Sequence, residues 1–282
     1  RGVPTNCEVV EFNWQSQKRT RNKFIVFDFI KTCINDFLLS SQNLFLKAKA
    51  SKVWFKFYKE QLEKAYLLKE LITKLDIKIE QTLFYDYWFT NSGLALSLLK
   101  EEAPQFKFIS RAHRYGFYDE TWMCPIPFRN TVASAASFIF TCSEDGTNYF
   151  KSKVAKKLHY KINTGYLGVK DNSMGKTPVT SPFQIVSCSS VIPRKRIEKI
   201  IQALALLKNV NFIWTHIGDG PELSRMVNLA KDTLPDDSFR FVGQKSNKDV
   251  ILYYKESEID VLLNLSESEG LPVSIMEAYS FG

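Results

Sequence analysis

The sequence has 282 residues, of which 45% are hydrophobic and 24% are charged, and these values are ordinary for a globular protein. A chain of this length can hold two hydrophobic cores. It contains no apolar run near the roughly 20 residues that a membrane-spanning helix needs, and no secretory signal opens it, so neither an integral membrane protein nor a secreted one is expected. The scattered cysteines, without CxxC pairs, are typical of reduced thiols in a cytoplasmic protein.

Charge is unevenly spread along the chain. Residues 1–175 carry 26 Lys or Arg and 17 Asp or Glu, a net charge of +9, whereas residues 176–282 carry 12 and 13, a net charge of −1. The basic half predicts contact with an anionic surface, either membrane headgroups or nucleic acid. The alternative is a solvated basic surface without a partner. Because the chain lacks an initiator Met and stops at Gly282, we expect a fragment of a longer protein.

The first half begins with a predicted strand at residues 6–13 and continues with a helical region over about 22–75, broken near Ser51. Its aromatic side chains either lie on a membrane with the lysines in the headgroups or pack inward with the lysines in solvent. The imperfect periodicity favours inward packing. Alternating strands and helices follow, which predicts right-handed βαβ units and a parallel sheet. The strands are expected at 82–88, 106–110, 138–142 and 161–169, with one helix at 91–100 and another after Ser143, which is expected to cap it.

The second half repeats the α/β pattern after a run rich in Asn, Ser, Thr and Pro. Such a run is typical of a linker, so the sequence predicts domains at 1–170 and 183–282 joined by residues 171–182. The strands are expected at 184–188, 211–217, 238–242 and 259–265. The helices are expected to start at Pro193, after Gly218-Asp219-Gly220, at Asn247 and near Pro272, where proline suits a first helical turn.

The loop after the last predicted strand carries Glu269, and the helix that follows carries Glu277. In an open α/β sheet, ligands bind at the carboxyl ends of the strands. A helix N-terminus at that edge offers free N–H groups to a phosphate, and carboxylates accept hydrogen bonds from sugar hydroxyls. A ligand that needs both is a nucleotide sugar. The alternative is an ordinary helix with one Glu near its start and another on its surface.

Three consecutive cations, Arg194-Lys195-Arg196, are predicted at the first turn of another helix. The helix dipole disfavours cations there unless an anion lies nearby, and a diphosphate supplies one. The alternative is a solvated basic turn. His113 directly follows a predicted strand, with Arg111 and Arg114 close by. A lone His is usually structural, but these cations favour a neutral, hydrogen-bonding imidazole.

The run E-G-L-P-V-S-I-M-E-A over residues 269–278 resembles the signature of the GT-B retaining glycosyltransferases of family 4. S-C-S-S-V-I-P-R-K-R-I resembles the diphosphate-binding segment of that family, with Lys195 in the place of its usual Lys. Ser190 departs from the Arg that many members carry there. The run S-R-A-H-R-Y-G-F-Y-D-E, followed by P-I-P-F-R at 125–129, resembles the acceptor-side loop. The resemblance covers residues 106–282 well.

The resemblance implies an α/β fold with two Rossmann-like domains facing across a cleft, both incomplete here. It implies an enzyme that transfers sugar, with retention, from a UDP- or GDP-sugar to a saccharide or lipid-linked acceptor in bacterial surface polysaccharide synthesis. By resemblance, His113 and Glu269 are catalytic, and Arg194, Lys195 and Gly270 hold the diphosphate. Glu269 and Glu277 bind the donor sugar and ribose, and Gln244 binds the base. No cofactor is implied, and without a D-x-D motif no metal is expected.

Two other functions stay open at this point. One is another GT-B enzyme, such as a nucleotide-sugar 2-epimerase, and the other is a non-catalytic basic module that binds nucleic acid. No nucleic-acid-binding motif favours the module. The expected location is the cytoplasm, with peripheral contact at the inner face of the membrane. Relatives carry a Gly-rich loop and a C-terminal portion that this sequence lacks, which leaves open whether this length of chain is active.

Overall fold

The computed structural model describes residues 25–38, 51–122, 125–176 and 181–282. The strand predicted at residues 6–13 lies outside these ranges. The described chain forms two compact units, one ending at Tyr166 and the other spanning Leu167–Gly282. Within the described ranges, no helix has the length and apolar character needed to cross a bilayer.

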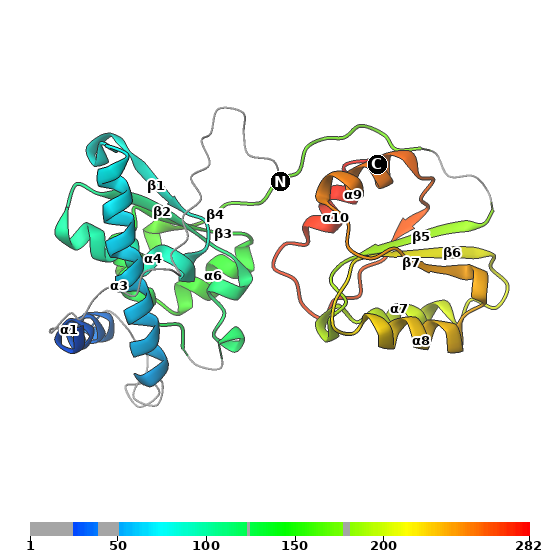
Figure 1. The fold of residues 1–282 in the computed structure, drawn as a ribbon, viewed down its shortest axis with the longest axis horizontal. Coiled ribbons are helices and arrows are strands. Elements are labelled where there is room, and N and C mark those ends of the chain that lie inside the picture. The colour runs from blue at the N-terminus through cyan, green and yellow to red at the C-terminus, as the bar shows by residue number, and fades with distance from the viewer. Residues whose placement is uncertain (1–24, 39–50, 123–124, 177–180) are drawn as a thin grey trace. The chain divides into compact units, whose positions relative to one another are not determined.

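The first unit is a parallel sheet with helices, as the alternation of strands and helices predicts (Figure 1). Its strands pair in the order β1-β2-β3-β4. Helix α4 packs on β1 and β2, and α3 packs on α4. The elements are α1 (Ile25–Leu38), α3 (Ser51–Lys74), β1 (Leu83–Asp86), α4 (Phe89–Glu102), β2 (Lys107–Ala112), α5 (Arg129–Ala135), β3 (Phe138–Thr141), α6 (Glu144–Ser152) and β4 (Ile162–Thr164).

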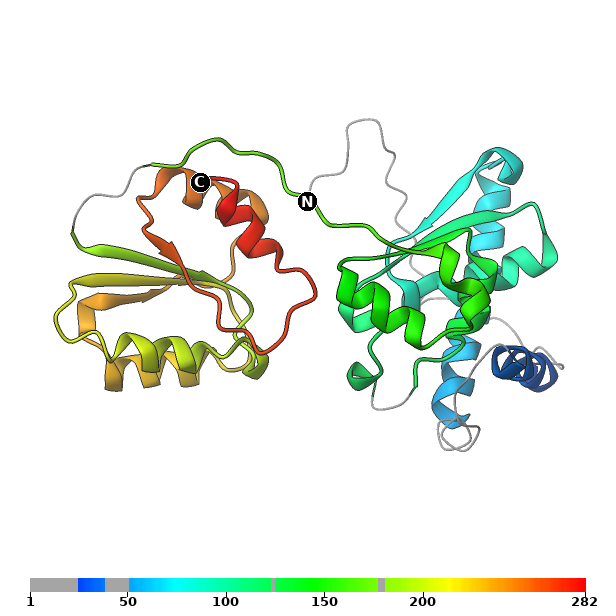
Figure 2. The ribbon, with the colours of Figure 1, turned by 180° about the vertical axis from the view of Figure 1, so that it is seen from behind.

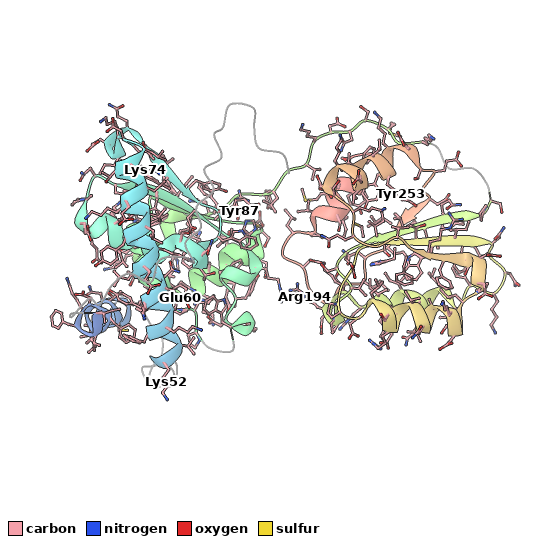
Figure 3. The ribbon with its side chains drawn as sticks, in the orientation of Figure 1. Lys52, Glu60, Lys74, Tyr87, Arg194 and Tyr253 are labelled. Carbon is pink, nitrogen blue, oxygen red and sulfur yellow. The ribbon has the colours of Figure 1, made fainter. Side chains whose placement is uncertain are left out.

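The aromatic side chains of α3 pack inward. Trp54, Phe57 and Tyr58 are buried in the core of this unit, whereas Lys52 and Lys74 are exposed at opposite ends of the helix (Figure 3). The inward-packing prediction is therefore confirmed for this helix. Helix α1 differs, because four of its large apolar side chains are exposed: Val26, Phe27, Ile30 and Ile34.

The second unit is also a parallel sheet, in the order β7-β6-β5-β8. Helices α7 and α8 lie along one face and α9 and α10 along the other, as both ribbon views show (Figures 1 and 2). A doubly wound sheet of this kind buries both of its faces. The elements are β5 (Phe183–Cys188), α7 (Ile197–Leu204), β6 (Phe212–Ile217), α8 (Leu223–Thr233), β7 (Phe239–Phe241), α9 (Asn247–Glu256), β8 (Val261–Leu262) and α10 (Val273–Tyr279).

Three predicted boundaries in this unit are wrong. Pro193 opens a separate 3₁₀ turn (Pro193–Lys195) instead of α7, because Arg196 takes the left-handed conformation with φ of 51° and breaks the helical path. Strand β8 is shorter than expected, because it pairs with β5 alone through Val261 and Leu262. Pro272 is the extended N-cap residue of α10 and lies just before its first turn.

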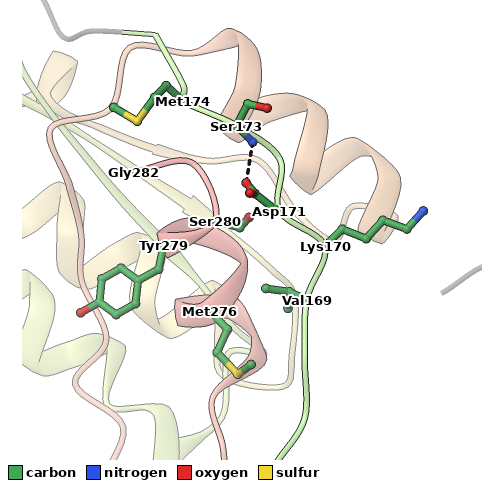
Figure 4. Close-up of a pocket in the computed structure, with 9 residues that line it drawn as sticks. All are labelled: Val169, Lys170, Asp171, Ser173, Met174, Met276, Tyr279, Ser280 and Gly282. Carbon is green, nitrogen blue, oxygen red and sulfur yellow. Dashed lines mark hydrogen bonds between the residues drawn. The ribbon is translucent and has the colours of Figure 1, made fainter.

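The described part of the predicted linker lies against α10. The backbone N–H of Asn172 donates to the carbonyl of Ser280 at 3.1 Å, and that of Gly175 donates to Phe281 at 2.8 Å. A hollow of about 790 Å³ lies where this segment passes the end of α10, beside Met174, Met276 and Tyr279 (Figure 4). None of the predicted site residues lines it.

Candidate functional site

The loops that follow β5, β6 and β7 meet at one edge of the second sheet. Backbone hydrogen bonds join them, from Ser189 N to Ile217 O at 3.0 Å and from Gly218 N to Gly243 O at 2.9 Å. Gly218 has φ of 149°, and a Cβ there would lie 1.9 Å from the Ser189 carbonyl oxygen, so this approach requires glycine. The carboxyl ends of the strands therefore form one continuous edge, where open α/β sheets bind ligands.

Lys195 and Glu269 form an ion pair at this edge. Lys195 Nζ lies 2.5 Å from Glu269 Oε1, with 17% and 25% of the two side chains exposed. Burial works to raise the pKa of Glu269, but hydrogen bonds from Lys195 and Ser266 and the lysine charge outweigh burial and hold the pKa below its usual value. Glu269 is therefore an ionised carboxylate at neutral pH, and its oxygens can accept hydrogen bonds from hydroxyl groups.

Two further contacts join the basic turn to the loop that carries Glu269. Arg196 Nη2 lies 3.0 Å from Glu267 Oε1, and the backbone N–H of Glu267 donates to the carbonyl of Arg194 at 2.9 Å. The Arg194 side chain is exposed and extends from its unit (Figure 3). The three predicted cations thus lie beside the glutamate loop, although they precede α7 instead of forming its first turn.

Glu277 is buried on α10, at 8% exposure, and accepts a hydrogen bond from Asn247 Nδ2 at 2.8 Å. Asn247 is the first residue of α9, and the sequence analysis did not identify it. Its only signal in the sequence is its place at the start of a helix after a strand. Burial raises the pKa of the Cys188 thiol. The charge of Glu277 also raises this pKa, whereas the charge of Lys195 lowers it. Since this thiol lies near both groups, Lys195, Glu269 and Glu277 gather around the carboxyl end of β5.

The other predicted residues of this unit are spread more widely. Gln244 is exposed on the loop after β7, at the opposite edge of the sheet from β8. Gly270 is half-buried between Glu269 and α10, and Ser190 is exposed between β5 and the basic turn. The loop that carries Gln244 leads into Asn247, whose side chain binds Glu277.

His113 belongs to the first unit, where it follows β2. The rings of Tyr87 and Trp88 pack against its imidazole, with ring centroids at 4.7 and 4.5 Å. Its Nδ1 lies 3.3 Å from the sulfur of Cys142, which directly follows β3. Arg114 lies over the ring of Tyr118. The imidazole is therefore packed against two adjacent aromatic rings and against the Cys142 sulfur.

Arg129 and His216 have structural roles. Arg129 is buried in the run that resembles the acceptor-side loop, and its guanidinium binds Asp119 at 2.6 Å and the Phe117 carbonyl at 2.8 Å. His216 is fully buried, with Nδ1 2.8 Å from Ser187 Oγ, and burial lowers its pKa to about 4. A neutral imidazole held in this way maintains the sheet. Among the described residues, no group of three or more His, Cys, Asp or Glu side chains could hold a metal ion.

The second unit is similar to proteins of a known family. The family described as "Glycosyl transferases group 1" matches residues 169–282. The amylovoran biosynthesis glycosyltransferase AmsK of Erwinia amylovora is 28% identical over 131 residues, which cover 43% of this chain and 32% of that protein. This chain thus matches about a third of the length of that relative.

Solved structures show the fold. The lipopolysaccharide outer core galactosyltransferase WaaB aligns with a TM-score of 0.60 at 14% identity, covering 78% of this chain and 59% of that one. HepE of Anabaena, in complex with UDP and glucose, aligns with a TM-score of 0.58 at 16% identity, covering 76% and 60%. The chain has the α/β fold of the GT-B glycosyltransferases, and its residues 169–282 match the group 1 glycosyltransferase family.

Proposed function

We propose that this protein is a retaining glycosyltransferase that takes a sugar from a nucleoside diphosphate sugar and transfers it to a saccharide or lipid-linked acceptor. The observation that carries the proposal is the gathering of Lys195, Glu269 and Glu277 at the carboxyl end of β5, in a domain of a glycosyltransferase family. A nucleotide sugar needs a cation for its diphosphate and acceptors for its hydroxyls. The cluster supplies both types of group within one edge of the sheet.

The proposed roles follow from the chemistry of each group. Departure of a nucleoside diphosphate leaves negative charge on its phosphates, which Lys195 and the exposed Arg194 stabilise. Ionised Glu269 accepts hydrogen bonds from the donor sugar, while Gly270 lies beside the diphosphate. His113, in the first unit, is assigned a catalytic role of its own. Glu277, held by Asn247, binds the ribose hydroxyls, and Gln244 contacts the base. In this proposal the cations neutralise the diphosphate without a metal ion or a cofactor.

Ser190 bears on the strength of donor binding. It occupies a position where an Arg is common in the family that the sequence resembles. Arg194 is exposed, and its backbone carbonyl is hydrogen-bonded to the loop that carries Glu269. We therefore assign the second cationic contact with the diphosphate to Arg194.

The biological setting is part of the proposal. AmsK is named for amylovoran biosynthesis and WaaB for the lipopolysaccharide outer core, which supports a role in bacterial surface polysaccharide synthesis. The structure of HepE holds UDP, which makes UDP-sugars the first donors to test. A lipid-linked acceptor would place the protein in the cytoplasm, against the inner face of the membrane. The exposed apolar side chains of α1 and the net charge of +9 over residues 1–175 suit such peripheral contact.

A thermal-shift panel of UDP-, GDP- and ADP-sugars tests the donor site. A bound donor stabilises the fold by mass action, so we expect one nucleotide class to raise Tm. Lys195→Ala should lose most of that increase, whereas Lys199→Ala, an exposed lysine on α7, should keep it. The shift should survive EDTA. An unchanged donor response in Lys195→Ala would remove Lys195 from the site.

Product analysis then separates transfer from the alternatives. A transferase joins the sugar to an added acceptor with its anomeric configuration retained, whereas a 2-epimerase returns an altered nucleotide sugar. A basic binding module binds RNA or DNA in a salt-sensitive way and forms no product. Glu277→Ala should reduce transfer and leave such nucleic-acid binding unchanged.

A further inference from the structure

His113 has a neighbour whose chemistry bears on which ring nitrogen carries the proton. The sulfur of Cys142 lies 3.3 Å from His113 Nδ1, within hydrogen-bond range for sulfur. Cys142 directly follows β3 and His113 directly follows β2, and these strands pair in parallel up to Ala112 and Thr141. The register of the sheet therefore brings the two side chains together.

A cation also acts on the Cys142 sulfur. The positive charge of the Arg111 guanidinium works to lower the pKa of the thiol, and Arg111 Nη1 donates to the carbonyl of Gly165 at 3.0 Å. The thiol carries a single hydrogen, so it can donate to one acceptor at a time.

Cys142 has a hydrogen to donate because it is a thiol at neutral pH. The side chain is buried, at 5% exposure, and burial raises its pKa, although the charge of Arg111 works in the opposite direction. Two acceptors lie within reach of that hydrogen. Nδ1 of His113 is at 3.3 Å and the Ala112 carbonyl is at 3.8 Å, so the imidazole is the closer partner.

We infer that Cys142 is a positioning residue that donates its S–H hydrogen to Nδ1 of His113 and thereby holds the imidazole as the Nε2–H tautomer. The rings of Tyr87 and Trp88 fix the plane of the imidazole, and Cys142 fixes its rotation and its proton. The hydrogen bond between Cys142 and His113 does not depend on any enzymatic activity. Its consequence for sugar transfer rests on the role proposed above for His113. In that role, Nε2–H is the group that donates a hydrogen bond.

Nitrogen NMR of the full chain with ¹⁵N-labelled histidine tests the inference directly. The sequence has three histidines, and His113→Gln identifies the signals of His113 by their loss. In the wild type we expect two widely separated ring-nitrogen shifts, with the hydrogen on Nε2. A hydrogen on Nδ1 in the wild type would overturn the inference, whatever the variants do.

Substitutions then test the role of the sulfur. In Cys142→Ala we expect the Nδ1 shift of His113 to move toward the value of a free, tautomer-averaged imidazole. Cys142→Ser keeps a hydrogen-bond donor, so in that variant we expect the Nδ1 shift to lie close to its wild-type value. Cys33→Ser, in α1 of the same unit, is the matched control and should leave the His113 signals in place. Unchanged His113 shifts in a folded Cys142→Ala variant would also overturn the inference.

Activity measurements separate this inference from the proposed function. Once a donor and acceptor are known, Cys142→Ala should lower kcat about fivefold to tenfold with little change in donor KM, and Cys142→Ser should recover most of the loss. If no transfer occurs while the NMR result holds, the proposed function fails and the hydrogen bond stands. If transfer occurs and Cys142→Ala has full activity, the positioning role fails and the proposed function stands.

Discussion

At the scale of single residues, the buried carboxyl of Asp86 dominates the expected pH dependence of the first unit. Asp86 ends β1 at 4% exposure and accepts a hydrogen bond from Ser110 Oγ at 2.7 Å. Burial raises its pKa to about 7, from an ordinary value of 3.8 for an exposed Asp. Between these values the folded chain holds a proton that the unfolded chain releases. The stability from this group is therefore fully present below about pH 4 and is lost as the pH rises to 7.

Asp86→Asn removes this titration while it keeps an acceptor for Ser110. We expect the variant to gain Tm over the wild type at pH 8 and to show little gain at pH 4.5. Comparing the two proteins at the same pH cancels the contributions of the other titrating groups to stability. His216 is one such group, because its lowered pKa makes stability fall as the pH falls below 6.5. Asp76→Asn, at an exposed site, is the control. A difference in Tm between Asp86→Asn and the wild type that stays constant with pH would contradict the prediction.

The sequence identified two residues that the structure brings together. Lys195 and Glu269 were each predicted to bind a nucleotide sugar, and they form an ion pair with each other. Their binding of such a ligand stays a prediction. Asn247 and Cys142 were missed, because the hydrogen bond from Asn247 to Glu277 and the contact between Cys142 and His113 join elements that are distant in sequence. No spacing rule shows which strand ends lie side by side.

At the scale of elements, helix starts were predicted well where a side chain caps them. Ser143 Oγ accepts from the backbone N–H of Gly146 at 3.1 Å at the start of α6, and Ser246 Oγ accepts from Asp249 N at 3.2 Å at the start of α9. Such caps are readable because a small polar residue binds the first turn of its own helix. Helix α7 was mispredicted at its start, because Arg196 takes the left-handed conformation there and breaks the helical path.

The two caps allow a paired prediction about the units. Ser143→Ala should lower the free energy of unfolding of the first unit by about 1 kcal/mol, and Ser246→Ala should do the same for the second, since each leaves a helical N–H without its partner. Ser143→Gly should cost only a few tenths of a kcal/mol. Urea unfolding with separate probes for the two units measures these effects. Equal destabilisation of both units by either variant would show that they unfold together.

At the scale of the whole molecule, the uneven charge leads us to predict that the first half of the chain contacts anionic membranes. We expect co-sedimentation with phosphatidylglycerol vesicles at low salt, with binding falling as salt screens the attraction, and none with phosphatidylcholine vesicles. Phe27→Ser, in the exposed stripe of α1, should weaken binding.

A matched pair of charge reversals provides the control for membrane binding. Lys52→Glu with Lys56→Glu reverses two exposed lysines on α3, and Lys208→Glu with Lys231→Glu reverses two in the other unit. Both pairs change the net charge equally. The first should weaken binding more, and equal losses would mean that only net charge matters. If the wild type fails to sediment with anionic vesicles at low salt, the membrane proposal fails.

The sequence by itself determined the α/β class, the parallel sheets, the order of the described elements and the types of residue at the candidate site. These features depend on periodicity, on turn and cap residues and on a short motif, all of which act over a few neighbouring positions. Only the tertiary structure decided the left-handed turn at Arg196, the gathering of Lys195, Glu269 and Glu277 at β5, and the contact between Cys142 and His113. Those depend on strand register and loop packing, which bring together side chains that no local pattern connects.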